Sequence, residues 1–136
     1  MMARARSAKE NEKRDLSAHD KKHLKQRLEE ERRSVVGRLR AHLGEATEDT
    51  HPLADEMDLA TRHQDQAYLL RLAEKERKLL IEINHALAKF DGDSYGACEG
   101  TGEPIGLRRL EARPWTRFSI AYKEQLERER AAKRER

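Results

Sequence analysis

Residues 44–61, GEATEDTHPLADEMDLAT, separate two long helical patterns and decide how the chain folds back on itself. The segment holds six acidic residues and neither lysine nor arginine, although the whole chain has a formal net charge of +3. Gly44 and Pro52 mark a turn, while Asp55 and Asp58 would fall near one face of a helix that begins there. Both carboxylates suit the positive end of a helix dipole. The segment is therefore a helix start, an acidic functional tip, or both.

Apolar residues recur at helical spacing on both sides of this segment, which is the pattern of amphipathic helices. They are Leu24, Leu28, Val35, Leu39 and Leu43 before it, and Leu69, Leu72, Leu79, Ile83, Leu87 and Phe90 after it. Two helices with one narrow apolar stripe each bury those stripes most simply against each other. The sequence predicts an all-α, mainly helical fold: a long antiparallel coiled-coil hairpin over residues 17–90, with Ser17 as N-cap and an acidic tip near 44–61.

The remaining segments differ from the hairpin in composition. The composition predicts a flexible basic tail for residues 1–16, a small loop-rich globular unit for residues 91–118, and a C-terminal helix for residues 119–136.

The composition of the whole chain limits its fold and its location. With 40% charged and 4% aromatic residues, the chain cannot bury a large globular core. The single cysteine, Cys98, excludes an intramolecular disulfide. Because no long apolar run is present, we expect a cytoplasmic protein that does not enter a membrane.

Residues 95–123, YGACEGTGEPIGLRRLEARPWTRFSIAYK, carry the most specific motif of the sequence. The run RLEARP at 109–114, with Cys98 and the glycines before it, resembles the C4 zinc finger of the DksA/TraR family of bacterial transcription regulators. The acidic segment also matches this family's tip pattern D-x-x-D-x-A, and the resemblance covers about residues 17–130. The matching tip residues are Asp55, Asp58 and Ala60.

The four zinc-ligand positions of this family hold one thiol and three hydroxyl side chains in this chain. They are Cys98, Thr101, Ser119 and Tyr122. Structural zinc requires thiolate or imidazole donors, which neutral hydroxyls do not replace. We therefore predict a degenerate zinc-finger-like unit without zinc, in which Cys98 is a small buried residue and apolar packing centres on Trp115. The packing residues expected are Ile105, Leu107, Leu110, Trp115, Phe118, Ile120 and Tyr122.

The resemblance implies a function. In this family the hairpin enters the secondary channel of bacterial RNA polymerase, where the tip acts near the active centre without performing chemistry. We expect a monomeric, non-enzymatic regulator that binds RNA polymerase, modulates open-complex stability at promoters through the tip residues, and does not recognise DNA sequence directly. The resemblance also implies a part in the stringent response. Arg113 and Lys123 match basic family positions at the polymerase rim and the guanosine tetraphosphate site, but Glu82 replaces a lysine there, so we expect a weak or absent alarmone response.

Two other functions stay open. The net positive charge and the basic ends favour a helical protein that binds nucleic acid or the ribosome. Against this, basic residues alternate with acidic ones, and few aromatic side chains are available for stacking on bases. A coiled-coil adaptor that does not bind polymerase is the third interpretation. The acidic tip distinguishes them, because nucleic-acid binding would not need it.

Overall fold

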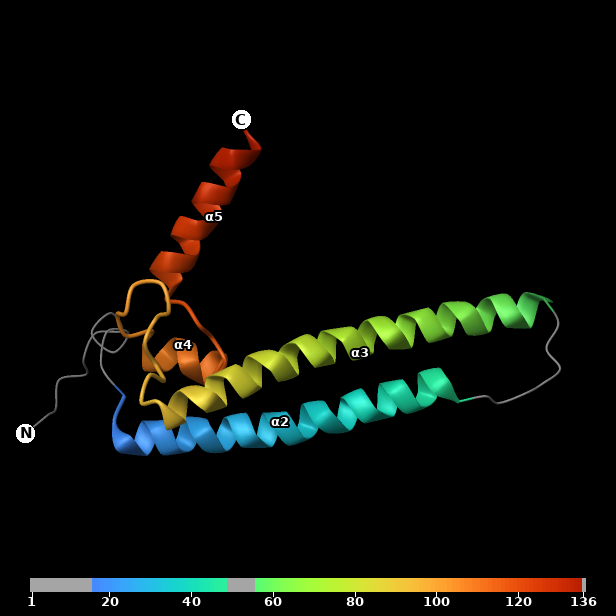
Figure 1. The fold of residues 1–136 in the computed structure, drawn as a ribbon, viewed down its shortest axis with the longest axis horizontal. Coiled ribbons are helices and arrows are strands. Elements are labelled where there is room, and N and C mark those ends of the chain that lie inside the picture. Colours follow the sequence, from blue (N-terminus) through green and yellow to red (C-terminus); the bar gives the residue numbers. More distant parts are fainter. Residues whose placement is uncertain (1–15, 49–55, 136) are drawn as a thin grey trace, which may run out of the picture. The chain divides into compact units, whose positions relative to one another are not determined.

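The computed structural model describes residues 16–48 and 56–135. Their secondary structure is helical, and the described residues contain no β-strand beyond an isolated bridge between Ala97 and Pro104. The helices are α2 (Ala18–Thr47), α3 (Glu56–Asp91), α4 (Leu107–Ala112) and α5 (Ile120–Arg134) (Figure 1). None of these helices is long and apolar enough to cross a membrane. The prediction of a mainly helical fold is confirmed.

The described residues form two compact units. Unit 1 contains the described parts of residues 1–29 and 85–136, and unit 2 contains the described parts of residues 30–84. The boundary between the units falls inside α2 and inside α3. Each of the two long helices therefore contributes a segment to both units.

In unit 2, α2 and α3 lie side by side and run in opposite directions (Figure 1). Arg38 of α2 forms a salt bridge with Glu76 of α3, with 3.1 Å between Nε and Oε1. Nearer the ends of these helices, Gln66 Nε2 donates to the Ala46 carbonyl oxygen at 2.7 Å. Arg38 of α2 pairs with residue 76 of α3, and Ala46, further along α2, pairs with residue 66, which comes earlier in α3. This order is expected for two antiparallel helices. The predicted helical hairpin is confirmed in this unit.

The buried face of α2 differs from the predicted stripe near the end of the helix. Leu28 and Val35 are fully buried as predicted, but Leu43 is 42% exposed. The buried positions continue instead at His42, which is half-buried, and at Ala46. Leu43 lies one residue beyond His42 and therefore about 100° further round the helix. The assignment of Leu43 to the stripe was wrong.

His42 occupies a place in this seam that the apolar pattern did not predict. Its Nδ1 atom is buried and has no hydrogen-bond partner among the described residues. An unsatisfied buried polar atom costs about 1–3 kcal/mol. The hairpin is therefore less stable here than it would be with a leucine at this position.

The apolar stripe of α3 follows its prediction, since all of its members are buried or half-buried: Leu69, Leu72, Leu79, Ile83, Leu87 and Phe90.

Leu110 of α4 is one of the fully buried side chains of unit 1. The other buried apolar residues of this unit are Leu24, Leu28, Ala86, Tyr95, Cys98 and Ile105. The predicted centre, Trp115, is only half-buried, and Ile120 is exposed. Trp115 lies in the loop after α4, and Ile120 begins α5, a helix without buried residues. The fully buried part of this core holds Leu110 of the short helix α4, and not Trp115, the largest side chain.

The predicted N-cap of α2 is confirmed. The Ser17 hydroxyl oxygen accepts from the Asp20 backbone N–H, and the Ser17 N–H donates to the Asp20 carboxylate, both at 3.1 Å. This reciprocal pair is a capping box. The preceding Leu16 packs on Gly96, where an added Cβ would lie 2.9 Å from Leu16 Cδ1. The start of α2 is thereby packed against the loop that follows α3.

Candidate functional site

Two of the predicted tip residues, Asp58 and Ala60, lie at the start of α3, in unit 2. Asp55 lies outside the described residues. Asp58 is exposed in the first turn of α3, where the positive end of the helix dipole favours a carboxylate. Ala60 is exposed on the next turn. The described part of the tip therefore presents a carboxylate and a small side chain to solvent.

Two large apolar side chains flank Asp58, and sequence reasoning missed them. Met57 is 81% exposed, and Leu59 is exposed as well. Exposed apolar side chains next to a charged group are common where a protein meets a partner. Neither residue belongs to the apolar stripe predicted for the hairpin. Their position outside the stripe could have indicated that both side chains are exposed.

The four degenerate zinc-ligand positions come together in unit 1. Cys98 is 2% exposed, and the Ser119 hydroxyl caps α5 by accepting from the Tyr122 N–H at 3.3 Å. Burial raises the pKa of the Cys98 thiol, but hydrogen bonds from the backbones and hydroxyls of Ser119 and Thr101 outweigh it and lower the pKa to about 7. The thiol is therefore part thiolate at neutral pH, but its burial limits access by reagents.

These four side chains do not fit a structural zinc ion. Cys98 is the only thiol among them, whereas a tetrahedral zinc site uses four thiolate or imidazole donors. The Tyr122 ring also packs directly over Gly100, so that a Cβ added to Gly100 would overlap the ring. The same ring is tilted against Phe118, with 5.3 Å between the ring centroids. An aromatic ring thus fills the loop that carries Cys98 and Thr101, and within the described residues no group of three or more His, Cys, Asp or Glu side chains could hold a metal ion.

Glu99 joins this loop to α3 through charged groups. Its carboxylate accepts from His85 Nε2 and from Lys89 Nζ at 2.9 Å, and Arg117 Nη1 lies 4.0 Å away. Burial raises the pKa of Glu99, but hydrogen bonds to His85 and Lys89 and the positive charge of Lys89 lower it overall. Sequence reasoning missed this cluster, because only the spacing of four between His85 and Lys89 was visible.

Replacing Glu99 with glutamine is expected to lower the free energy of unfolding of unit 1 by about 1–3 kcal/mol. The reason is that Lys89, whose side chain is 11% exposed, would lose its carboxylate partner. Because folding lowers the pKa of Glu99, this stabilisation is complete above the ordinary pKa of glutamate and is lost as the pH falls through the lower folded pKa. Urea denaturation followed by Trp115 fluorescence, at neutral and at acidic pH, measures the effect.

The matched control for this prediction is Glu103→Gln, which removes an exposed carboxylate from the same loop. We expect this control to unfold like the unmodified chain at both pH values. A Glu99→Gln loss no greater than that of the control would contradict the prediction, as would a loss of equal size at acidic pH.

The predicted rim residues Arg113 and Lys123 are both exposed in unit 1. Arg113 is the C-cap of α4, and its N–H donates to the Arg109 carbonyl oxygen at 2.9 Å. Lys123 lies in the first turn of α5. Glu82 is half-buried and belongs to unit 2. Both basic side chains are thus available to a partner.

Two family models match most of this chain. The model described as DnaK suppressor protein DksA, N-terminal domain, matches residues 20–90. The model described as prokaryotic dksA/traR C4-type zinc finger matches residues 93–121. The first match covers the hairpin, and the second covers three of the four degenerate ligand positions, Cys98, Thr101 and Ser119.

Individual proteins are also similar to this chain. The RNA polymerase-binding transcription factor DksA of Caulobacter vibrioides is 39% identical over 106 residues, which are 78% of this chain and 75% of that protein. The protein of the same name from Haemophilus influenzae is 47% identical over 60 residues, 44% of this chain and 41% of its own length. The structure of transcription factor DksA2 from Pseudomonas aeruginosa matches with a TM-score of 0.77 and 36% identity, covering 85% of this chain and 88% of that chain.

Proposed function

The chain belongs to the DksA/TraR family, and from this membership we propose that it is a transcription regulator that binds bacterial RNA polymerase. The observation that carries the proposal is the extent of the similarity. It includes both the hairpin and the finger-like unit, and it covers 78% of the chain in a relative that is named for binding RNA polymerase. The protein acts as a monomer in the cytoplasm, catalyses no reaction and does not recognise DNA sequence directly.

In this proposal the hairpin enters the secondary channel of the polymerase, and the tip residues Asp55, Asp58 and Ala60 act near its active centre. The exposure of Asp58 and Met57 to solvent at the start of α3 supports this role. A regulator of this kind shifts the balance between conformations of the polymerase. Contacts that favour one conformation by about 1–3 kcal/mol change its population about 5- to 150-fold.

Unit 1 makes the second contact in this proposal. Arg113 and Lys123 contact the outer rim of the channel, where acidic groups on the partner would complement their positive charge. In the family resemblance, Glu82 replaces a lysine that would contact guanosine tetraphosphate, and its negative charge opposes a polyphosphate. The alarmone is therefore expected to add little to the activity. Unit 1 makes its contact with the polymerase without zinc, because the side chains at its four ligand positions do not fit the metal.

The lifetime of the open complex at a ribosomal RNA promoter tests the proposal. The unmodified chain is expected to bind polymerase and to shorten this lifetime by about 5- to 150-fold. The variant Asp55→Asn/Asp58→Asn should bind but leave the lifetime unchanged, because it removes the two predicted tip carboxylates and replaces them with side chains of nearly the same size. The matched control, Asp65→Asn, removes an exposed carboxylate further along α3 and should act like the unmodified chain.

Failure of the unmodified chain to bind polymerase would overturn the proposal. Binding to bare nucleic acid would then be measured at several salt concentrations. A steep fall of affinity with salt, unaffected by the tip variant, would indicate the nucleic-acid-binding function instead.

A further inference from the structure

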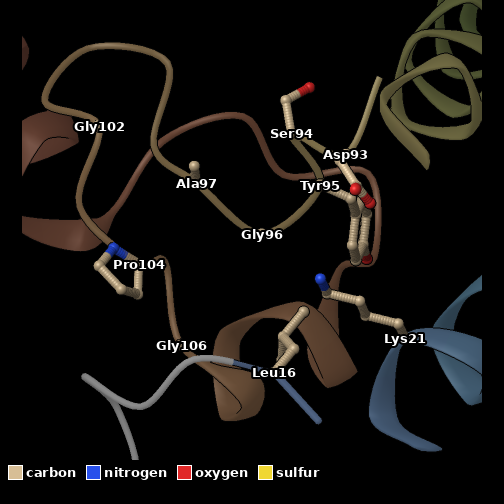
Figure 2. A pocket seen from close by; sticks show the side chains of 10 residues that line it. All are labelled: Leu16, Lys21, Asp93, Ser94, Tyr95, Gly96, Ala97, Gly102, Pro104 and Gly106. Carbon is tan, nitrogen blue, oxygen red and sulfur yellow. The ribbon is translucent and has the colours of Figure 1, made fainter. Parts of the chain in front are cut away.

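A cavity of about 370 Å³ opens within unit 1, between the start of α2 and the loops 93–97 and 102–106 (Figure 2). Its volume lies in the range of about 300–1,000 Å³ that is common for small-molecule sites. The residues that line it include neither the tip residues nor Arg113 and Lys123. The cavity is therefore separate from the surfaces assigned to polymerase.

Part of the cavity wall is bare backbone. Gly96 and Gly106 have φ values of 92° and 104°, a conformation that side-chain-bearing residues rarely adopt. At Gly96 an added Cβ would also press on Leu16, at 2.9 Å from its Cδ1. The two glycines thus leave their part of the wall without side chains, while Leu16, Tyr95 and Pro104 line it with apolar groups.

Two opposite charges line the same cavity. Figure 2 shows the Lys21 side chain reaching into the space near Leu16 and Tyr95, with Asp93 and Ser94 at another edge. Among the described residues, neither the Lys21 ammonium nor the Asp93 carboxylate makes a hydrogen bond or an ion pair. Each can pair with a ligand group of the opposite charge.

We propose that this cavity binds a free α-amino acid with an aliphatic side chain. Its carboxylate would pair with Lys21, its ammonium with Asp93, and its side chain would pack on Leu16, Tyr95 and Pro104. A polyanion fits less well, because Asp93 would repel it. An uncharged apolar ligand would desolvate both charges without replacing their hydration. A small zwitterion satisfies both charges at once.

Titration of the isotope-labelled full-length chain with L-leucine, followed by two-dimensional NMR, tests this proposal. The amide signals of Gly96, Gly102 and Gly106 are expected to shift and to saturate. Isocaproate lacks the ammonium group of leucine, and isoamylamine lacks its carboxylate. Each is expected to bind about tenfold more weakly than leucine, which corresponds to about 1.4 kcal/mol. This comparison uses the unmodified chain and does not depend on any variant folding.

Two variants test whether Lys21 and Asp93 each bind a charged group of the ligand. Lys21→Met and Asp93→Asn are each expected to weaken leucine binding about tenfold. Asparagine is suitable at position 93 because it tolerates the positive φ of 58° found there. The matched controls, Lys22→Met and Asp91→Asn, change exposed neighbours outside the cavity and should bind leucine normally. Circular dichroism confirms that each variant is folded.

The proposal is overturned if no aliphatic amino acid gives saturable shifts at these glycines at millimolar concentration. It is also overturned if isocaproate and isoamylamine bind as tightly as leucine, or if Lys21→Met and Asp93→Asn bind it like the controls. None of these measurements involves polymerase, so failure here leaves the proposed function untouched.

Discussion

Replacing Gly100 with alanine is expected to lower the free energy of unfolding of unit 1 by about 1–3 kcal/mol, although the change adds only one methyl group. The backbone at Gly100 is not in the positive-φ region, which among the described glycines holds Gly96, Gly102 and Gly106. Alanine could therefore adopt this backbone without strain. The loss comes instead from the Tyr122 ring, which occupies the place of the new methyl group.

The ring has little freedom to move away. Tyr122 lies in the first turn of α5, its backbone is held by the Ser119 cap, and its ring is tilted against Phe118. A displaced ring would give up these aromatic contacts and open the loop around Cys98. Urea denaturation followed by fluorescence of Trp115, the single tryptophan of the chain, measures the loss.

Two comparisons isolate the clash. Gly92→Ala places a methyl group where no atom lies within 4 Å, so its stability should stay close to that of the unmodified chain. In a Tyr122→Ala background the ring is absent, and Gly100→Ala should then cost little. A double-mutant cycle expresses this difference as an interaction energy. If Gly100→Ala costs the same in both backgrounds, the ring is not the cause and the interpretation of this loop is wrong.

The parts of the fold that the sequence predicted correctly depend on local patterns. The α3 stripe and the Ser17 cap follow from residues within a few turns of each other, and the structure confirms both. The four degenerate ligand positions were predicted from a motif in register, and in the structure Thr101 and Ser119 hydrogen-bond to Cys98. Leu43 was misplaced because it neighbours a seam position held by His42, and a histidine does not contribute to an apolar pattern.

The parts that sequence reasoning missed depend on contacts between distant segments. Glu99 meets His85 and Lys89 only because the loop returns to the end of α3. Lys21 and Asp93 line one cavity only because α2 begins beside the loop after α3. The choice of Trp115 as core centre failed for the same reason. Side-chain size suggested it, but the packing of α4 against the rest of unit 1 buries Leu110 instead.

Restoring the three missing thiols is expected to produce the second large effect. The variant Thr101→Cys/Ser119→Cys/Tyr122→Cys would join Cys98 in a set of four thiolates, the donor set that structural zinc prefers. We expect it to bind about one zinc ion per chain. Bound zinc contributes about 10–16 kcal/mol to the folding of small zinc-binding peptides, so unfolding of unit 1 should become strongly metal-dependent. Without metal, the variant should be less stable than the unmodified chain, because it has lost the Tyr122 ring.

Metal analysis of the purified proteins, and urea denaturation with and without a strong chelator, test this prediction. The unmodified chain should hold no zinc and should unfold identically in both conditions, since its donors do not fit the metal. Thr101→Cys alone is the matched control, because two thiols are too few for a structural site. Zinc in the unmodified chain at about one ion per chain would show that hydroxyl donors suffice here. A triple variant that takes up no zinc would show instead that the Tyr122 ring has reshaped the loop beyond what new thiols can reverse.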